Sequence, residues 1–259
     1  MSVQTSELVA ETPYIWRARR PESTGRLICL PHAGAGALAY ADWVPLLPPD
    51  IELVAVQLPG RQNRIAEEPF TSVGPLVSTL THALRPVLDR PYAIFGHSCG
   101  AALAFELAKA LRARGRRGPD QLFMSAHPAP GFTGVRQLSG LPDDEFRAEM
   151  LALGGIDREI LDDPFVLDSL LPVLRTDFAL WEGHRPAPSD PLDCPLTVLC
   201  GDDDPRTPPD SVAGWQAHTN AEFYARFYPG GHFYFLESGA ADVVSFLSRK
   251  MQTTMGRAA

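Results

Sequence analysis

The chain has 259 residues, of which 45% are hydrophobic, enough for a substantial folded core. Its formal net charge of −8 disfavours nucleic acid as a partner, because binding to phosphates requires a concentrated basic face. No apolar run approaches the ~18 residues of a membrane-spanning helix. The opening sequence MSVQTSELVAETPY has neither the basic nor the apolar region of a secretory signal. We therefore expect a cytoplasmic protein with no membrane partner.

The four cysteines, at positions 29, 99, 194 and 200, are scattered along the chain. Their spacing matches neither a disulfide framework nor a metal site. Three of them lie in or beside apolar runs that are typical of strands, where buried free thiols are common. We therefore expect neither a disulfide nor a metal from this set.

Predicted strands and helices alternate through the first half of the chain. The strands are expected at 26–30, 51–56, 92–95 and 121–126, and the helices at 41–47, at 71–88 and directly after the third strand. Such alternation predicts an α/β fold with a mostly parallel central sheet and helices on both faces. Residues 1–12 are polar, and we expect them to form a frayed end.

The pattern changes between residues 131 and 185, where no convincing strand occurs. A helix is predicted over 142–153, with proline at its first position and an acidic first turn. A second, strongly apolar helix is expected over about 164–181. We interpret 131–185 as a helical lid insertion within one domain that spans residues 1–259. Simple helical cover for the core is the alternative.

The strand pattern returns near the end of the chain. Strands are predicted over 196–200 and 222–228, followed by a closing helix over 237–250 and a loose polar tail. The late strands extend the predicted sheet, and the loops that follow them carry polar residues.

The stretch YAIFGHSCGAALAFELAK at 92–109 contains a strand, a tight turn and a helix without an intervening loop. Its turn fits the G-x-S-x-G pattern of a nucleophile elbow, with Ser98 at the centre. We expect the turn to press Gly96 against Gly100, so that a Cβ at either position would collide. Ser98 would then hold a strained backbone conformation with its Oγ at the top of the sheet. An ordinary turn with a serine N-cap is the alternative.

A serine nucleophile requires a base and an acid that orients the base. In elbow hydrolases the chain order is Ser, Asp or Glu, then His, with the last two in loops after late strands. The chain offers Ser98, the run Asp202 to Asp204, and His232 in this order. We choose Asp204 because it lies furthest along its loop and precedes Pro205, although physical reasoning alone does not separate it from Asp202.

The remaining histidines fit the role of base less well, and we expect His32 and His97 to shape the site instead. The loop PHAGAGA at 31–37 follows an early strand, where elbow hydrolases supply an oxyanion-hole amide. Ala33 is our candidate for that donor, and a merely tight turn is the alternative. The loop lacks the G-x-G-x-x-G spacing of a dinucleotide site.

Five segments together resemble the type II thioesterases of polyketide and nonribosomal peptide assembly lines, which have the α/β-hydrolase fold. The segments are PHAGAGA, QLPGRQNR, GHSCG, GDDDP and GGHFYF, in the order found in that family. The resemblance implies Ser98, Asp204 and His232 as the catalytic triad and the amides of Ala33 and Cys99 as the oxyanion hole. It also implies a mobile lid over an acyl chamber. Cys99 departs from the family, in which methionine usually follows the nucleophile.

The resemblance implies a serine thioesterase that removes aberrant or stalled acyl groups from the phosphopantetheine arm of acyl or peptidyl carrier proteins. It implies no metal and no organic cofactor. A cytosolic carboxylesterase of the same fold and a binding protein with an idle triad are the alternatives. Arg61, Arg64 and the basic run at 109–117 are candidates for carrier docking, although cations also favour a helix C-terminus without any partner. The sequence leaves the acyl chain, the pathway and the oligomeric state open.

Overall fold

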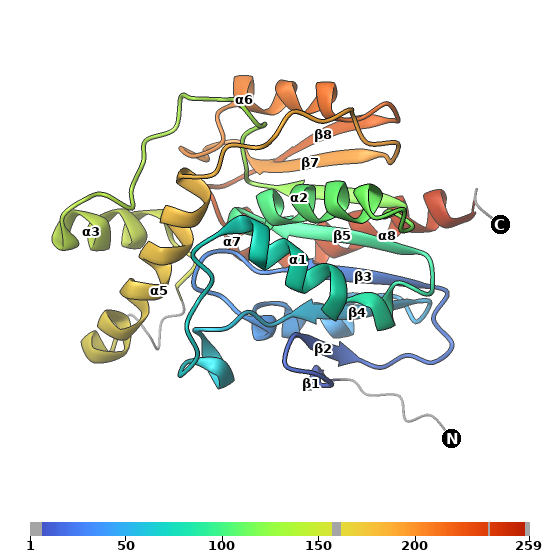
Figure 1. Cartoon of the computed structure of the whole chain (residues 1–259), viewed down its shortest axis with the longest axis horizontal. Helices are drawn as coiled ribbons and strands as arrows, with labels where there is room; N and C mark the ends of the chain where they lie inside the picture. The colour runs from blue at the N-terminus through green and yellow to red at the C-terminus, as the bar shows by residue number, and fades with distance from the viewer. Residues whose placement is uncertain (1–6, 157–161, 238, 257–259) are drawn as a thin grey trace.

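A computed structural model of the chain describes residues 7–156, 162–237 and 239–256. Its centre is an eight-stranded sheet with the order β1-β2-β4-β3-β5-β6-β7-β8 (Figure 1). The strands are β1 (Val9–Ala10), β2 (Ile15–Ala18), β3 (Gly25–Leu30), β4 (Ile51–Val56), β5 (Tyr92–His97), β6 (Gln121–Ser125), β7 (Leu196–Gly201) and β8 (Phe223–Tyr228). Strands β3 to β8 pair in parallel, and β1 and β2 pair antiparallel at one edge. The prediction of a mostly parallel sheet is confirmed.

Helices cover both faces of this sheet. The α-helices are α1 (Val73–Ala83), α2 (Cys99–Ala113), α3 (Asp143–Leu153), α5 (Pro164–Glu182), α6 (Pro209–Ala213), α7 (Tyr234–Glu237) and α8 (Ala240–Gly256). Short 3-10 helices are η1 (Ala37–Leu46), η2 (Gln62–Arg64), η3 (Arg85–Val87) and η4 (Gly214–His218). Helices α1 and α2 pack on one face, and α8 with η1 packs on the other.

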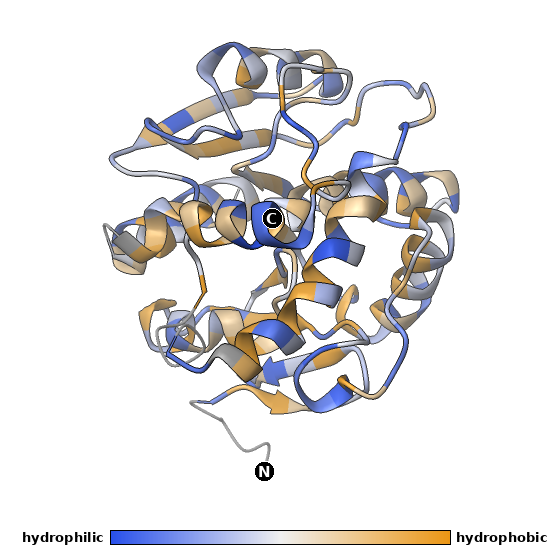
Figure 2. Cartoon of the chain, turned by 90° about the vertical axis from the view of Figure 1, so that its left-hand side faces the viewer, coloured by the Kyte–Doolittle hydropathy of each residue, from blue (hydrophilic) through white to orange (hydrophobic). Residues whose placement is uncertain are grey.

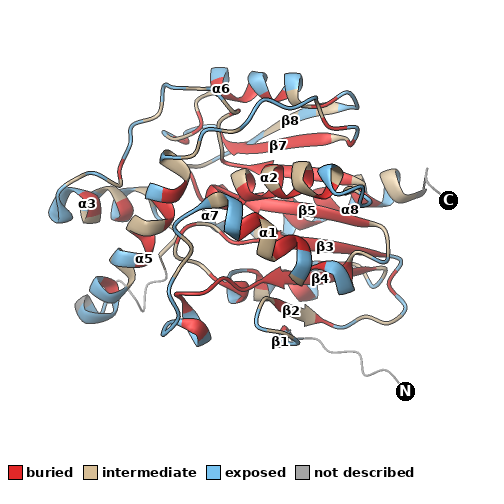
Figure 3. Cartoon of the chain, in the orientation of Figure 1, coloured by how far each residue is buried: buried red, intermediate tan, exposed pale blue. Residues whose placement is uncertain are grey.

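The parallel strands β3 to β7 are buried on both faces, which explains why they read as continuous apolar runs, whereas the edge strand β8 is partly exposed (Figure 3). Side chains alternate between the faces along a strand. In β3, Ile28 and Leu30 join the cluster under α1 and α2, whereas Leu27 and Cys29 join the cluster under α8. In the sequence these strands are therefore marked by continuous hydrophobic residues, including β-branched ones, and not by alternating polar and apolar residues.

The N-terminal hairpin of β1 and β2 was not predicted from the sequence. Residues 7–12 are not part of a frayed end, because β1 and β2 form an antiparallel ribbon that pairs with β4. Ile15 is buried beside Val56, and the Arg17 guanidinium forms an ion pair with the buried carboxylate of Glu52. The partners in these contacts are about forty residues apart along the chain, so the local sequence does not reveal them.

Two predicted helices have other bounds in the structure. The stretch predicted over 71–88 consists of α1 and the separate turn η3, because Pro86 lacks the N–H that an α-helix would need there. The closing helix begins at Ala240 rather than at residue 237, after Gly239 takes a φ of +89°. It continues to Gly256, so the expectation of a loose tail from residue 251 is wrong, and Met251 is buried in the core.

The described part of 131–185 holds helices and no strand, as predicted. Helix α3 begins one residue later than expected, with Pro142 preceding the helix as its N-cap. Helix α5 begins after Asp163, whose carboxylate accepts the N–H groups of Phe165 and Val166. Figure 1 shows both helices at the left, beyond the end of the sheet, and Figure 2 views the molecule from that side. No helix among the described residues is long and apolar enough to cross a membrane.

Candidate active site

The turn between β5 and α2 holds Ser98 in an unusual backbone conformation. Its φ is +54° and its ψ is −122°, a combination that L-residues adopt only where the surroundings enforce it. The Ser98 N–H donates to the carbonyl of Ser125 at 2.8 Å, which continues the β5–β6 pairing into the turn. The predicted strain at the elbow is thus confirmed, and the Ser98 side chain lies at the carboxyl end of the sheet.

Three residues from distant parts of the chain form one continuous chain of hydrogen bonds. The Nε2 of His232 lies 3.0 Å from the Ser98 Oγ, and its Nδ1 lies 2.9 Å from the Asp204 Oδ2. All three residues are buried, with at most 9% of their surface exposed. This is the geometry in which a histidine can accept the serine proton while a carboxylate fixes its ring.

The structure distinguishes the aspartates that the sequence left open. Asp204 faces His232, whereas the Oδ1 of Asp202 accepts the Gly230 N–H at 3.0 Å. Burial alone would raise the pKa of the Asp204 carboxyl, but hydrogen bonds from His232 and the Arg206 N–H outweigh burial and lower that pKa. Asp204 therefore stays charged beside His232, and Asp202 instead braces the loop that carries His232.

His97 lies inside the protein next to His232 and does not act on Ser98. Its Nδ1 lies 2.9 Å from the Ser125 Oγ, which in turn lies 2.8 Å from the hydroxyl of Tyr234. The His97 and His232 rings have centroids 5.1 Å apart. Burial, followed by the nearby His232 and His32, lowers the pKa of His97 well below its ordinary value, so the ring is neutral. This agrees with the expectation that His97 shapes the site.

The candidate oxyanion donors lie on two segments that meet beneath α5. Cys99 is the first residue of α2, where backbone N–H groups lack helical partners and the helix dipole favours negative charge. Ala33 lies in the loop after β3. Both side chains pack in one buried cluster with Leu174 and Phe178 of α5. The loop and the helix N-terminus thus meet at the elbow, as an oxyanion hole requires.

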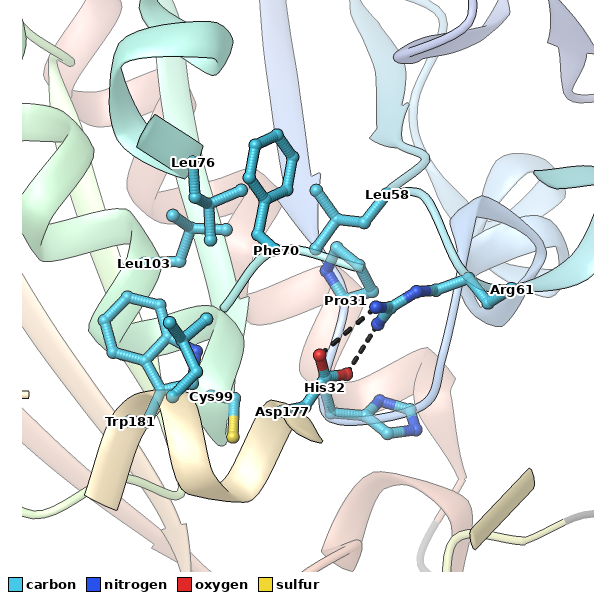
Figure 4. Close-up of a pocket in the computed structure, with 11 residues that line it drawn as sticks. Pro31, His32, Leu58, Arg61, Phe70, Leu76, Cys99, Leu103, Asp177 and Trp181 are labelled. Atoms are coloured by element: carbon cyan, nitrogen blue, oxygen red, sulfur yellow. Dashed lines mark hydrogen bonds and ion pairs between the residues drawn. The ribbon is translucent and has the colours of Figure 1, made fainter. Parts of the chain in front are cut away.

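A cavity of about 10 Å³ lies beside these residues (Figure 4). It has space for about one water molecule. Its walls include Cys99, Leu103 and Leu76 from the core side and Trp181 from α5. Most of the lining is apolar, and it includes Cys99, which directly follows Ser98 in the chain.

Two predictions about arginines are corrected by the structure. Arg61 and Arg64, considered as docking residues, are buried, with 3% and 7% of their surface exposed. Arg61 forms an ion pair with Asp177 of α5, and Arg64 forms one with Glu67. Neither guanidinium is available to an acidic partner on the surface.

Asp177 is a further site residue that was not predicted from the sequence. A signal was present, because Asp177 lies three residues after Leu174 and four before Trp181, on the apolar face of its helix. A carboxylate on such a face requires a buried partner.

Within the described ranges, no group of three or more His, Cys, Asp and Glu side chains is placed to hold a metal ion.

Comparisons with known proteins agree with this geometry. Residues 25–251 match the thioesterase domain family. The chain is 41% identical over 215 residues to Thioesterase PikA5 of Streptomyces venezuelae, covering 83% of this chain and 76% of that protein. The solved type II thioesterase BorB from the borrelidin biosynthetic cluster is 35% identical with a TM-score of 0.85, covering 94% of this chain and 99% of BorB.

A second solved structure is YbtT, the type II thioesterase of the yersiniabactin NRPS/PKS biosynthetic pathway. It is 28% identical with a TM-score of 0.81, and the match covers 93% of this chain and 99% of YbtT. The likeness therefore extends over nearly the whole chain in sequence and in fold. The chain belongs to the thioesterase family, as a type II thioesterase with the α/β-hydrolase fold.

Proposed function

We propose that this thioesterase hydrolyses acyl groups from the phosphopantetheine arm of acyl or peptidyl carrier proteins, and so removes aberrant or stalled chains during polyketide or nonribosomal peptide synthesis. The observation that carries this proposal is the buried chain from Ser98 through His232 to Asp204. The family membership and the largely apolar cavity beside Cys99 support an acyl substrate.

The proposed mechanism has two halves. His232 takes the proton of Ser98, and the Oγ attacks the thioester carbonyl, forming a tetrahedral oxyanion that the amides of Ala33 and Cys99 stabilise. The thiol of the arm leaves with the proton held by His232, and an acyl-enzyme remains. Water activated by His232 then attacks the ester, and the carboxylic acid leaves with Ser98 restored. Asp204 orients His232 and stabilises its charged form.

We further propose that residues 131–185 act as a lid within a single domain. Helix α5 covers the apolar cavity, and a space of about 10 Å³ cannot hold an acyl chain. An acyl group can therefore enter only if α5 moves outwards. Such gating movements are common where a site must exclude water during catalysis.

The test compares hydrolysis of one acyl group presented in three ways: on a carrier protein, on free pantetheine and as an oxygen ester. The proposal expects the highest kcat/KM for the carrier-bound thioester and no turnover by the Ser98→Ala variant. A preference for the oxygen ester would instead support a carboxylesterase. Absence of turnover, together with no labelling of Ser98 by a fluorophosphonate, would contradict any hydrolytic function.

A further inference from the structure

A buried ion pair joins α5 to the loop after β4. The Nη1 and Nη2 of Arg61 lie 2.6 Å and 3.1 Å from the Oδ2 and Oδ1 of Asp177, so the pair is bidentate (Figure 4). The two side chains are 3% and 9% exposed. Burial of two charges costs much of what their attraction returns, so such a pair is weak evidence for a role in stability alone. The position of the Arg61–Asp177 pair therefore requires an explanation other than stability.

The same carboxylate also holds the loop that carries the oxyanion donor. The Asp177 Oδ2 accepts the N–H of Gly34 at 2.8 Å, and Gly34 directly follows Ala33. Because a peptide group is planar, this bond fixes the plane of the Ala33–Gly34 peptide. It therefore restricts the backbone torsion on one side of Ala33, the residue whose own N–H is proposed to stabilise the oxyanion.

The remainder of the loop is held by one hydrogen bond to the body of the domain and one within the loop. Gln57, directly after β4, accepts the N–H of Ala37 at 2.8 Å, and the carbonyl of His32 accepts the N–H of Ala35 at 3.1 Å. The hydrogen bond to the Gly34 N–H comes from α5, through Asp177. Gly34 has a φ of +73°, and a Cβ built there would lie 2.7 Å from Leu174 of α5. The helix thus rests directly on the loop.

We infer that Asp177 is a positioning residue, which sets the oxyanion loop only while α5 is seated, and that Arg61 holds its carboxylate in place. The inference rests on the proposed function of the site. As a consequence, the position of α5 controls how fast a bound acyl group is hydrolysed. An acyl group that leaves Asp177 in contact with Gly34 meets a completed oxyanion hole, whereas one that displaces α5 far enough to break this contact meets a loop without it and is hydrolysed slowly.

Two substitutions at Asp177 separate positioning from stability. Asp177→Ala and Asp177→Asn both remove the ion pair with Arg61, but only the asparagine keeps an oxygen that can accept the Gly34 N–H. We expect Asp177→Ala to lower kcat by about 10- to 100-fold with little change in KM, because small misplacements near the reacting centre have effects of this size. Asp177→Asn should recover most of that loss.

Glu182 provides the matched control. It is a carboxylate on the same helix, and it accepts the N–H groups of Leu138 and Ser139 rather than those of the oxyanion loop. Glu182→Ala and Glu182→Gln should therefore show no comparable difference in kcat. Equal kcat values for Asp177→Ala and Asp177→Asn, or a kcat loss in Glu182→Ala as large as in Asp177→Ala, would overturn the inference.

A second measurement does not depend on turnover. Amide hydrogen exchange at Gly34 should be slow in the wild type and in Asp177→Asn, and faster in Asp177→Ala. Exchange that is the same in all three proteins would overturn the inference even if the enzyme hydrolyses thioesters. Conversely, the expected exchange pattern in a protein that hydrolyses nothing would support the Asp177 contact and contradict the proposed function.

Discussion

Gly96 and Gly100 approach so closely across the elbow that a Cβ built on Gly96 would lie 2.0 Å from the Gly100 carbonyl oxygen. A Cβ on Gly100 would in turn lie 2.4 Å from the carbonyl oxygen of Leu30. These obstacles are backbone atoms, which cannot move aside as a flexible side chain can. The steric reason expected from the sequence is confirmed for Gly96, whereas at Gly100 the obstacle is the backbone of Leu30 and Pro31 and not Gly96.

We therefore predict that Gly96→Ala destabilises the fold by about 3 kcal/mol or more, the upper range for overpacking. The matched control is Gly74→Ala on α1, where no atom lies within 4 Å of the added Cβ. This control should raise the free energy of unfolding by about 0.5–1 kcal/mol, because alanine favours a helix over glycine. Urea unfolding of both variants measures the difference, and similar stabilities would contradict the prediction.

The two candidate aspartates should differ sharply in activity. Asp204→Asn cannot stabilise a charged His232, and we expect kcat to fall by about 10⁴-fold, as in other triads. Asp202→Asn keeps an oxygen for the Gly230 N–H, and its kcat should stay within about threefold of the wild type. Steady-state hydrolysis of an acyl thioester provides the measurement. If kcat falls more in Asp202→Asn than in Asp204→Asn, the role proposed for Asp204 is wrong.

The buried His97 should make stability depend on pH. Burial keeps the folded-state pKa well below the ordinary value, whereas in the unfolded chain this side chain titrates near ~6.5. Below that pH the unfolded chain binds one proton more than the folded protein, so the free energy of unfolding decreases as the pH falls. The contribution of one such group is about 1.4 kcal/mol per pH unit.

Chemical unfolding of the wild type and of His97→Asn at several pH values below ~6.5 tests this. The slope of stability against pH should be smaller in the variant by the contribution of one proton. The absolute stability of His97→Asn is also expected to be lower, because Ser125 and Tyr234 lose a buried partner. Identical slopes would show that His97 is not the group that titrates.

Cys99 should be chemically inert despite its place after the nucleophile. Burial raises the pKa of its thiol to about 12, and the thiolate that alkylating reagents need is therefore absent at neutral pH. We predict no inactivation by iodoacetamide. In Ser98→Cys, by contrast, the new thiol lies beside His232 and should be alkylated. Mass spectrometry locates the modified residue, and modification of Cys99 in the folded wild type would contradict the prediction.

The basic run at 109–117 should not contribute to carrier docking. Helix α2 has 15 residues and begins beside Ser98, so its basic C-terminal end lies about 22 Å from the elbow (Figure 1). Several of its cations are also engaged within the protein, because Lys109 pairs with Glu106, Arg117 pairs with Asp120 and Arg112 donates to the carbonyls of Asp190 and Pro191. Charge reversal of the exposed Arg114 and Arg116 should leave kcat/KM for a carrier-bound substrate unchanged. A loss confined to the carrier-bound substrate, with pantetheine thioesters unaffected, would restore the docking hypothesis.

Local sequence determined the elbow and the alternating pattern of the fold. The turn around Ser98 is specified by its own glycines, and the buried strands by continuous apolar runs, because both depend on neighbours within a few residues. The positions of Ser98 and His232 also followed from chain order, since parallel strands end at the same edge of a sheet. These features could be predicted without knowledge of distant contacts.

Tertiary structure decided what depends on contacts between distant segments. Asp202 and Asp204 are equivalent in sequence, and only the path of the loop against Gly230 directs Asp204 to His232. Asp177 meets Arg61 and Gly34 across 116 and 143 positions of the chain. The partner of a buried charge is set by how whole elements pack together. The ion pair and hydrogen bonds that offset the desolvation of the charge form only when those elements are in contact.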